Sequence, residues 1–335
     1  MRYNKFYVTG TTGTITGDFT VPAEIDGYPV VEIGNYAFYS GEKKHRIENF
    51  TISEGIIKVG DSIVPNQMVA LKNIHIPSTL TEISENSFNR SYNVESFTVN
   101  ENNPLFYADS SGVLFKRGKI EGQDILFSYP CARPSNYYIV PDYAYKIGDY
   151  AARYAGIKHI FLSKNTKIIG ERAFQYSSIE EIDFGGTEQI GVLSFDSCNG
   201  LTQISLPDSV ESINSSSFSF CSNLKIVTIG SGIKTISSSF PNCNSLEVFK
   251  IDEKAVCRIN GGAFIGDKNL VSVIWGAGVY FADGSNAQFS GCASLKSIDI
   301  AENQSTLELR GAFKDCSLLE QLTAPRNLRY IKEEV

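Results

Sequence analysis

The amino-acid sequence predicts a solenoid of stacked coils with a parallel sheet along its concave side. Three observations lead to this prediction: a repeat of 21–25 residues, short alternating apolar patterns within each repeat, and phenylalanines and cysteines at fixed places in it. A chain of 335 residues suggests roughly two domains by length alone. A continuous repeat instead predicts one core running through about a dozen coils.

Phenylalanine marks each repeat in the second half of the sequence. The members of the series are Phe174, Phe195, Phe218, Phe240, Phe264, Phe289 and Phe313. Successive members are 21, 23, 22, 24, 25 and 24 residues apart. Self-similarity at such a period is typical of repeat architectures. A single coil cannot bury its apolar side chains alone, so we expect the coils to stack into a shared core.

Each repeat also contains an L-x-x-I-x-L pattern. The clearest copy covers residues 201–206 (LTQISL), where Ile204 and Leu206 alternate with Gln203 and Ser205. Such alternation predicts a short strand with one buried face. A period near 23 with this pattern is the signature of leucine-rich repeats. The predicted fold class is therefore a leucine-rich-repeat solenoid, α/β-type or mostly β, forming a right-handed curved superhelix.

Cysteine recurs three residues after most of these phenylalanines. The members of this second series are Cys198, Cys221, Cys243, Cys292 and Cys316. A disulfide framework, a metal cage or a ladder of small buried thiols could each produce it. We favour the ladder, because cysteine is compact and often fully buried. Side chains that point the same way from neighbouring coils are also farther apart than the ~3.5–4.5 Å between Cβ atoms of a disulfide. We therefore predict no metal site and no cofactor.

The repeat pattern sets the expected domain boundaries. Residues 1–20 lack it and are expected to form an N-terminal cap, and residues 21–335 the solenoid. Residues 100–145 interrupt the pattern with an irregular, tyrosine-rich insert. Its tyrosines either pack inward in irregular coils or form a platform for a carbohydrate or peptide. We favour inward packing, and keep the platform as the alternative.

The repeats resemble those of the BspA-type leucine-rich-repeat family of bacterial surface proteins. The match is closest at residues 33–38 (IGNYAF), 169–174 (IGERAF) and 311–316 (GAFKDC). The resemblance extends over nearly the whole chain. It implies a binding scaffold, often extracellular or at the cell surface, with adhesion to host or matrix proteins in some members. It implies no shared catalytic residues.

Charge and hydropathy argue against several other classes. The net charge of −7 disfavours a nucleic-acid partner. The longest stretch without charged or strongly polar residues, 273–282, is far shorter than the ~20 residues of a membrane-spanning helix. No apolar run follows the first charged residues, so we expect no secretory leader in this chain. No nucleophile has a His or Lys partner at a defined spacing, so no catalytic residue is predicted and an enzyme is the least favoured class.

The expected binding surface consists of residues that alternate with the buried ones along each strand. Most of them are small and polar. The exceptions are Ile226, Val248 and Ile274, with Lys250 beside them, and separately His159 and Phe161. Contiguous exposed apolar residues often mark interaction sites, although β-propensity alone also places Ile and Val in strands. The sequence thus predicts a non-enzymatic scaffold for a protein partner from a host, a matrix or another surface protein. The alternative is a glycan-binding module of a larger cell-wall protein that uses the tyrosine-rich insert.

Overall fold

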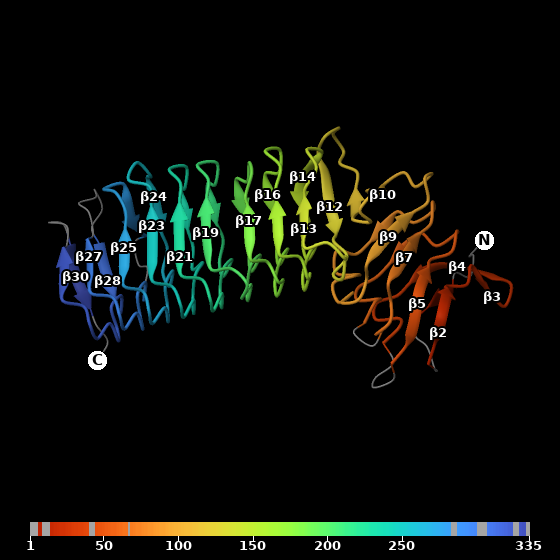
Figure 1. The fold of residues 1–335 in the computed structure, drawn as a ribbon, viewed down its shortest axis with the longest axis horizontal. Helices are drawn as coiled ribbons and strands as arrows, with labels where there is room; N and C mark the ends of the chain where they lie inside the picture. The colour runs from red at the N-terminus through yellow and green to blue at the C-terminus, as the bar shows by residue number, and fades with distance from the viewer. Residues whose placement is uncertain are drawn as a thin grey trace. The chain divides into compact units, whose positions relative to one another are not determined.

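The computed structural model describes residues 6–8, 14–39, 44–65, 68–282, 287–299, 307–323 and 328–332. The chain divides into two compact units, Met1–Asn136 with Tyr143–Ile157, and Tyr137–Asp142 with Lys158–Val335. Within each sheet the strands follow one another in chain order, and most of them pair with the second strand before and after them in the sequence (Figure 1). The described residues form strands and tight turns without any helix. The chain makes about a dozen coils. The predicted leucine-rich-repeat solenoid is confirmed, in its mostly β form.

The first unit contains two parallel sheets and an antiparallel meander. The first sheet consists of β1 (Phe6–Val8), β4 (Tyr28–Ile33), β6 (Lys58–Val59) and β8 (Glu82–Ile83), with β3 (Glu24–Ile25) antiparallel to β4. The second consists of β2 (Thr16–Thr20), β5 (Arg46–Thr51), β7 (Asn73–Ile76) and β9 (Ser96–Val99). The meander consists of β10 (Phe106–Ala108), β11 (Leu114–Lys116) and β12 (Asp124–Ser128), with β14 (Ala144–Ile147) parallel to β12. The meander lies within the tyrosine-rich insert predicted at residues 100–145.

In the second unit each coil from β15 onward contributes one front and one rear strand, and β13 adds one more front strand. The front strands are β13 (Tyr137–Ile139), β15 (His159–Phe161), β17 (Glu181–Asp183), β19 (Gln203–Leu206), β21 (Ile226–Ile229), β23 (Val248–Ile251), β25 (Ser272–Ile274), β27 (Ser297–Asp299) and β29 (Gln321–Thr323). The rear strands are β16 (Ile168–Ile169), β18 (Gln189–Ile190), β20 (Ser212–Ile213), β22 (Thr235–Ile236), β24 (Cys257–Ile259), β26 (Val279–Phe281), β28 (Leu307–Arg310) and β30 (Leu328–Lys332). The front strands form three parallel sheets, β13-β15-β17, β19-β21-β23-β25 and β27-β29.

Alternation along the front strands places one side chain in the core and the next at the surface. Ile204, Val227 and Phe249 are in register across three strands and are all buried. This is the pattern that the period-2 alternation predicts. Burial is therefore shared between coils rather than completed within one coil.

The phenylalanine series forms a continuous aromatic ladder inside the second unit. Neighbouring rings are stacked, with centroids 4.9–6.4 Å apart and ring planes within 15° of parallel. Phe218 is fully buried between Phe195 and Phe240. The ladder gives each coil the same apolar contact with the coil before it and the coil after it.

The cysteine series forms a second ladder, and all seven cysteines are free thiols. Each thiol of the series donates a hydrogen bond to the carbonyl of a ladder phenylalanine in the preceding coil, at 3.0–3.2 Å from sulfur to oxygen. Cys198, for example, donates to Phe174, and Cys316 to Phe289. Four members are buried, and Cys316 is half-buried. The repeat thus selects cysteine as a weak hydrogen-bond donor as well as a small apolar residue.

Candidate functional site

The outward-facing residues of the front strands in the second unit form the candidate site. Two groups of them are apolar, and an acidic and polar stretch separates these groups along the strand order. Glu181 and Asp183 on β17 and Gln203 and Ser205 on β19 make up that stretch, and all four are exposed. Small polar or charged residues are expected on a solvated sheet face, so the apolar groups are the informative exceptions.

The first apolar group, which we call the aliphatic patch, consists of Ile226, Val248 and Ile274. Ile226 is directly opposite Val248 on the neighbouring strand, and Lys250 is opposite Ile274. Ile226 is 42% exposed and Ile274 48% exposed, while Val248 is half-buried between its neighbours. The register therefore brings together the residues that the sequence analysis grouped, with the Lys250 ammonium group at their edge.

The second group, the aromatic cluster, extends beyond the two residues found from sequence. His159 and Phe161 are half-buried on β15. Their register partners on β13 are Tyr137 and Ile139, which are 58% and 65% exposed. Sequence analysis missed these two because it placed them in the irregular insert. The available signal was the 22-residue spacing between the alternating triplets YYI, starting at Tyr137, and HIF, starting at His159.

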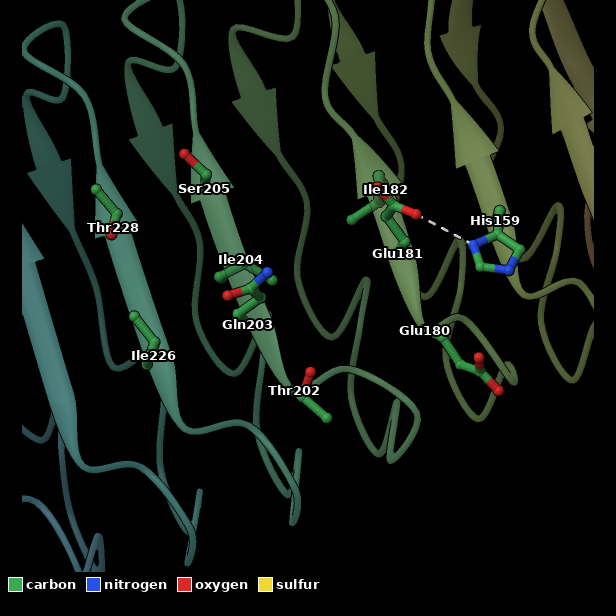
Figure 2. A pocket seen from close by; sticks show the side chains of 10 residues that line it. All are labelled: His159, Glu180, Glu181, Ile182, Thr202, Gln203, Ile204, Ser205, Ile226 and Thr228. Atoms are coloured by element: carbon green, nitrogen blue, oxygen red, sulfur yellow. Dashed lines mark hydrogen bonds and ion pairs between the residues drawn. The ribbon is translucent and has the colours of Figure 1, made fainter.

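A groove of about 570 Å³ lies between the two groups, at a break in the front sheet. β17 is the last strand of one sheet and β19 the first strand of the next, so no strand pairing joins them. Figure 2 shows the side chains that line the groove, which include His159, Glu181, Ile182, Gln203, Ile204 and Ile226. His159 belongs to the aromatic cluster and Ile226 to the aliphatic patch, so the groove connects the two predicted groups.

The break leaves backbone groups of both strands without a partner strand. Leu162 donates its N–H to the carbonyl of Asp183 at 2.8 Å, so that carbonyl points toward β15. Backbone groups of adjacent residues in a strand point to opposite sides. The N–H and C=O of Ile182 therefore point toward β19 and meet no strand there. The Ile182 side chain is half-buried, whereas Ile160 and Ile204 at the same position of the flanking coils are buried.

The coil that contains β17 has a shorter corner than its neighbours. Four residues (185–188) connect Phe184 to Gln189 on the rear strand. Five residues make the equivalent connection in each flanking coil, 163–167 before it and 207–211 after it. One residue of extended chain spans ~3.3–3.6 Å. The break therefore follows a coil whose corner has one residue fewer than the corners on either side of it.

Acidic side chains dominate the charge at the groove. The lining contains Glu180 and Glu181 and no lysine or arginine. Lys158 forms an ion pair with Glu180 at 2.7 Å, and His159 Nδ1 lies 3.2 Å from a carboxylate oxygen of Glu181. The hydrogen bond from Lys158 lowers the pKa of the Glu180 carboxyl. Of the two lining carboxylates, Glu181 is therefore the one without a lysine or arginine partner.

The tyrosine-rich insert, which is the alternative site, is largely occupied with its own packing. Phe115 stacks on the ring of Tyr107 at 5.5 Å, and the Arg117 guanidinium lies over the same ring at 4.6 Å. The Tyr107 hydroxyl donates to Asp124 at 2.6 Å, and Tyr129 is buried. A groove of about 400 Å³ beside Tyr107 and Arg117 is an open space that a sugar could enter.

The remaining chemistry of the described residues is sparse. They contain no cluster of three or more His, Cys, Asp or Glu side chains that could hold a metal ion. Within the same residues, no helix is long and apolar enough to cross a membrane.

Comparison with known proteins identifies the repeat. A model of the BspA-type leucine-rich-repeat region matches in six copies, at residues 24–110, 126–247 and 237–335. The chain belongs to the BspA-type leucine-rich-repeat family. Repeats of this family form scaffolds for protein interaction and are typically non-catalytic. Comparison with curated protein sequences gave no match.

Two crystal structures have the same fold as this BspA-type chain. A leucine-rich repeat protein from Eubacterium ventriosum is 18% identical, with 90% of this chain and 88% of that chain covered and a TM-score of 0.54. The pneumococcal vaccine antigen PcpA is 20% identical, with 71% of this chain and 67% of that chain covered and a TM-score of 0.55. At these identities the likeness establishes the fold alone.

Proposed function

We propose that this chain is a non-enzymatic scaffold that binds a protein partner through the front strands of its second unit. The aliphatic patch carries the proposal, because Ile226 and Ile274 are nearly half exposed on front strands whose outward positions are mostly polar. Exposed apolar residues next to one another favour protein contact. The aromatic cluster adds Tyr137 and Ile139, the most exposed apolar side chains of these strands. Aromatic side chains are enriched where interfaces bind most strongly.

We further propose that the protein acts outside the cell or at its surface, and that binding there serves adhesion to host, matrix or other surface proteins. Membership of the BspA-type family supports this location. The description of PcpA as a vaccine antigen is consistent with it. The partner is a protein in this proposal, and no cofactor takes part.

The test places a charge in the aliphatic patch. The purified chain is first screened by biolayer interferometry against a panel of extracellular-matrix and cell-surface proteins, and on a glycan array. Val248→Glu is then compared with Gln189→Glu, which adds the same charge at an exposed position of rear strand β18. We expect Val248→Glu to abolish binding to the protein hit and Gln189→Glu to leave it unchanged. Both variants are first checked for an unaltered circular dichroism spectrum.

The glycan-binding alternative is favoured by one observation, the groove beside Tyr107 and Arg117. Both the stacked Phe115 and the Arg117 cation already contact the Tyr107 ring, which weighs against sugar stacking there. Three results together would contradict the front-strand proposal: glycans bind, no protein of the panel binds, and Arg117→Ala removes the glycan signal. In that case the binding site lies in the insert.

A further inference from the structure

We infer that the groove between β17 and β19 binds an arginine side chain of the partner. This inference rests on the proposed function, since it names one feature of the partner that the front strands contact. Three isoleucines contribute apolar surface to the lining: the inward-facing Ile182 and Ile204, and the outward-facing Ile226 at the far side. This apolar surface matches the aliphatic part of a long basic side chain, which buries its methylene groups while its charged end stays in polar surroundings.

The walls of the groove offer hydrogen-bond acceptors for a guanidinium group. Glu181 lines one side on β17, with one carboxylate oxygen directed toward His159 on β15, and the Gln203 side-chain amide and the Ser205 hydroxyl line the other side on β19 (Figure 2). The carbonyl of Ile182 points into the space between the strands, where no N–H group of a paired strand donates to it. A guanidinium group has five N–H donors and no acceptor, so it can use several of these oxygens together.

Charge favours a cation here, and shape favours arginine over lysine. Lys158 pairs with Glu180, whereas Glu181 lines the groove with no lysine or arginine partner, and Asp183 is exposed on the same strand. A slot between two strand edges fits a planar group better than a compact, strongly hydrated ammonium. The planar fork of arginine also matches carboxylate oxygens in pairs.

The position of the groove suggests how the partner uses it. His159 on one side belongs to the aromatic cluster, and Ile226 on the other side belongs to the aliphatic patch. A partner segment lying across the front strands would therefore contact one apolar group, place its arginine in the groove and contact the other apolar group. The expected partner surface has a basic residue between apolar ones.

The experiment uses the whole chain, labelled at the isoleucine δ1 methyl groups, and a short peptide as the probe. The peptide is acetyl-Gly-Leu-Arg-Leu-Gly-amide, and the matched peptides carry citrulline or lysine in place of arginine. We expect the arginine peptide at millimolar concentration to shift the methyl signals of Ile182, Ile204 and Ile226. Citrulline has nearly the same shape without the charge, so its peptide should shift none of them, and the lysine peptide should bind more weakly.

Two variants provide the charge test. Glu181→Gln should weaken binding of the arginine peptide by about two- to fivefold, the usual effect of one exposed ion pair. Glu211→Gln removes a carboxylate of the same unit that pairs with Lys234 outside the groove, and should leave binding unchanged. Absence of shifts, equal shifts with citrulline, or equal affinity of Glu181→Gln and the unmodified protein would each overturn the inference.

These outcomes are independent of the test of the proposed function. Val248 does not line the groove. If Val248→Glu abolishes partner binding while the arginine peptide gives no shifts, the front strands bind a partner without an arginine anchor, and only the inference fails. If the peptide shifts the three methyl signals while Val248→Glu binds the partner normally, the groove is correct and the aliphatic patch is not the site.

Discussion

Replacement of Phe218 tests the packing that holds the second unit together. Phe218 is fully buried, and its ring stacks on Phe195 at 4.9 Å with 2° between the planes, and on Phe240 at 5.2 Å with 3°. Phe218→Ala removes both stacking contacts and leaves a cavity between two coils. Truncation of a buried phenylalanine costs ~3–5 kcal/mol. We expect the upper part of this range, since each stacked pair adds ~0.5–1.5 kcal/mol beyond burial.

The assay is urea denaturation followed by circular dichroism, with Phe220→Ala as the matched control. Phe220 lies two residues further along the same coil, but its side chain is 54% exposed. Its backbone has a φ of 54°, a conformation that phenylalanine and alanine both find unfavourable, so the substitution mainly removes surface. We expect Phe220→Ala to change the free energy of unfolding by less than about 1 kcal/mol.

The comparison also tests whether stability is shared between neighbouring coils. In a solenoid, removing a buried ring from one coil weakens its interfaces with the coils before and after it. The unfolding transition of Phe218→Ala should therefore broaden as well as shift. Equal destabilisation by the two substitutions, or an unchanged transition in Phe218→Ala, would show that the phenylalanine ladder does not carry the core.

Three further predictions concern buried groups and a close backbone contact. Burial raises the pKa of the Cys198 thiol to about 12. A thiol reagent at pH 8 should therefore react with few cysteines in the native protein and with close to seven after denaturation. Loss of folding on adding a reductant would contradict the prediction that the cysteines are free thiols. Burial also raises the pKa of the Asp267 carboxyl well above its usual range, and its Oδ2 atom has no hydrogen-bond partner. The folded protein then holds a proton that the unfolded chain releases above about pH 4, so stability should fall as pH rises. Asp267→Asn should be more stable than the unmodified protein at pH 7, and its stability should depend less on pH. If the stabilities of the two proteins change with pH in parallel, the reasoning is refuted. Gly186→Ala should lower the melting temperature, because its Cβ would lie 1.9 Å from the carbonyl oxygen of Lys164, and an unchanged melting temperature would argue against that close approach.

Much of the fold could be predicted because the repeat carries it in apolar residues. The spacing of Phe195, Phe218 and Phe240 predicts stacked coils, and the alternation in residues 201–206 predicts one strand in each coil. Periodicity of 2 fixes which side chains face outward, so the neighbours Ile226 and Val248 could be placed in register without a structure. The role of the cysteines was predicted only in part, because their hydrogen bonds to the phenylalanine carbonyls depend on how the coils are aligned.

The groove could not be predicted from the strand pattern. It lies where β17 and β19 do not pair, while the L-x-x-I-x-L pattern continues on both sides of the break. A pattern of buried residues reports which face of a strand is inside, and does not report whether two strand edges form hydrogen bonds. Tyr137 and Ile139 were missed for a related reason, since a regular strand follows directly after irregular residues.

Hydroxyl-radical footprinting of the chain with and without its protein partner tests the central claim most directly. The method reports the solvent exposure of individual side chains. We predict that the partner lowers the oxidation rates of Ile226, Val248 and Ile274, and of Tyr137 and Phe161, and leaves Tyr107 and Tyr143 unchanged. Protection of Tyr107 and Tyr143 without any change on the front strands would contradict binding through the front strands.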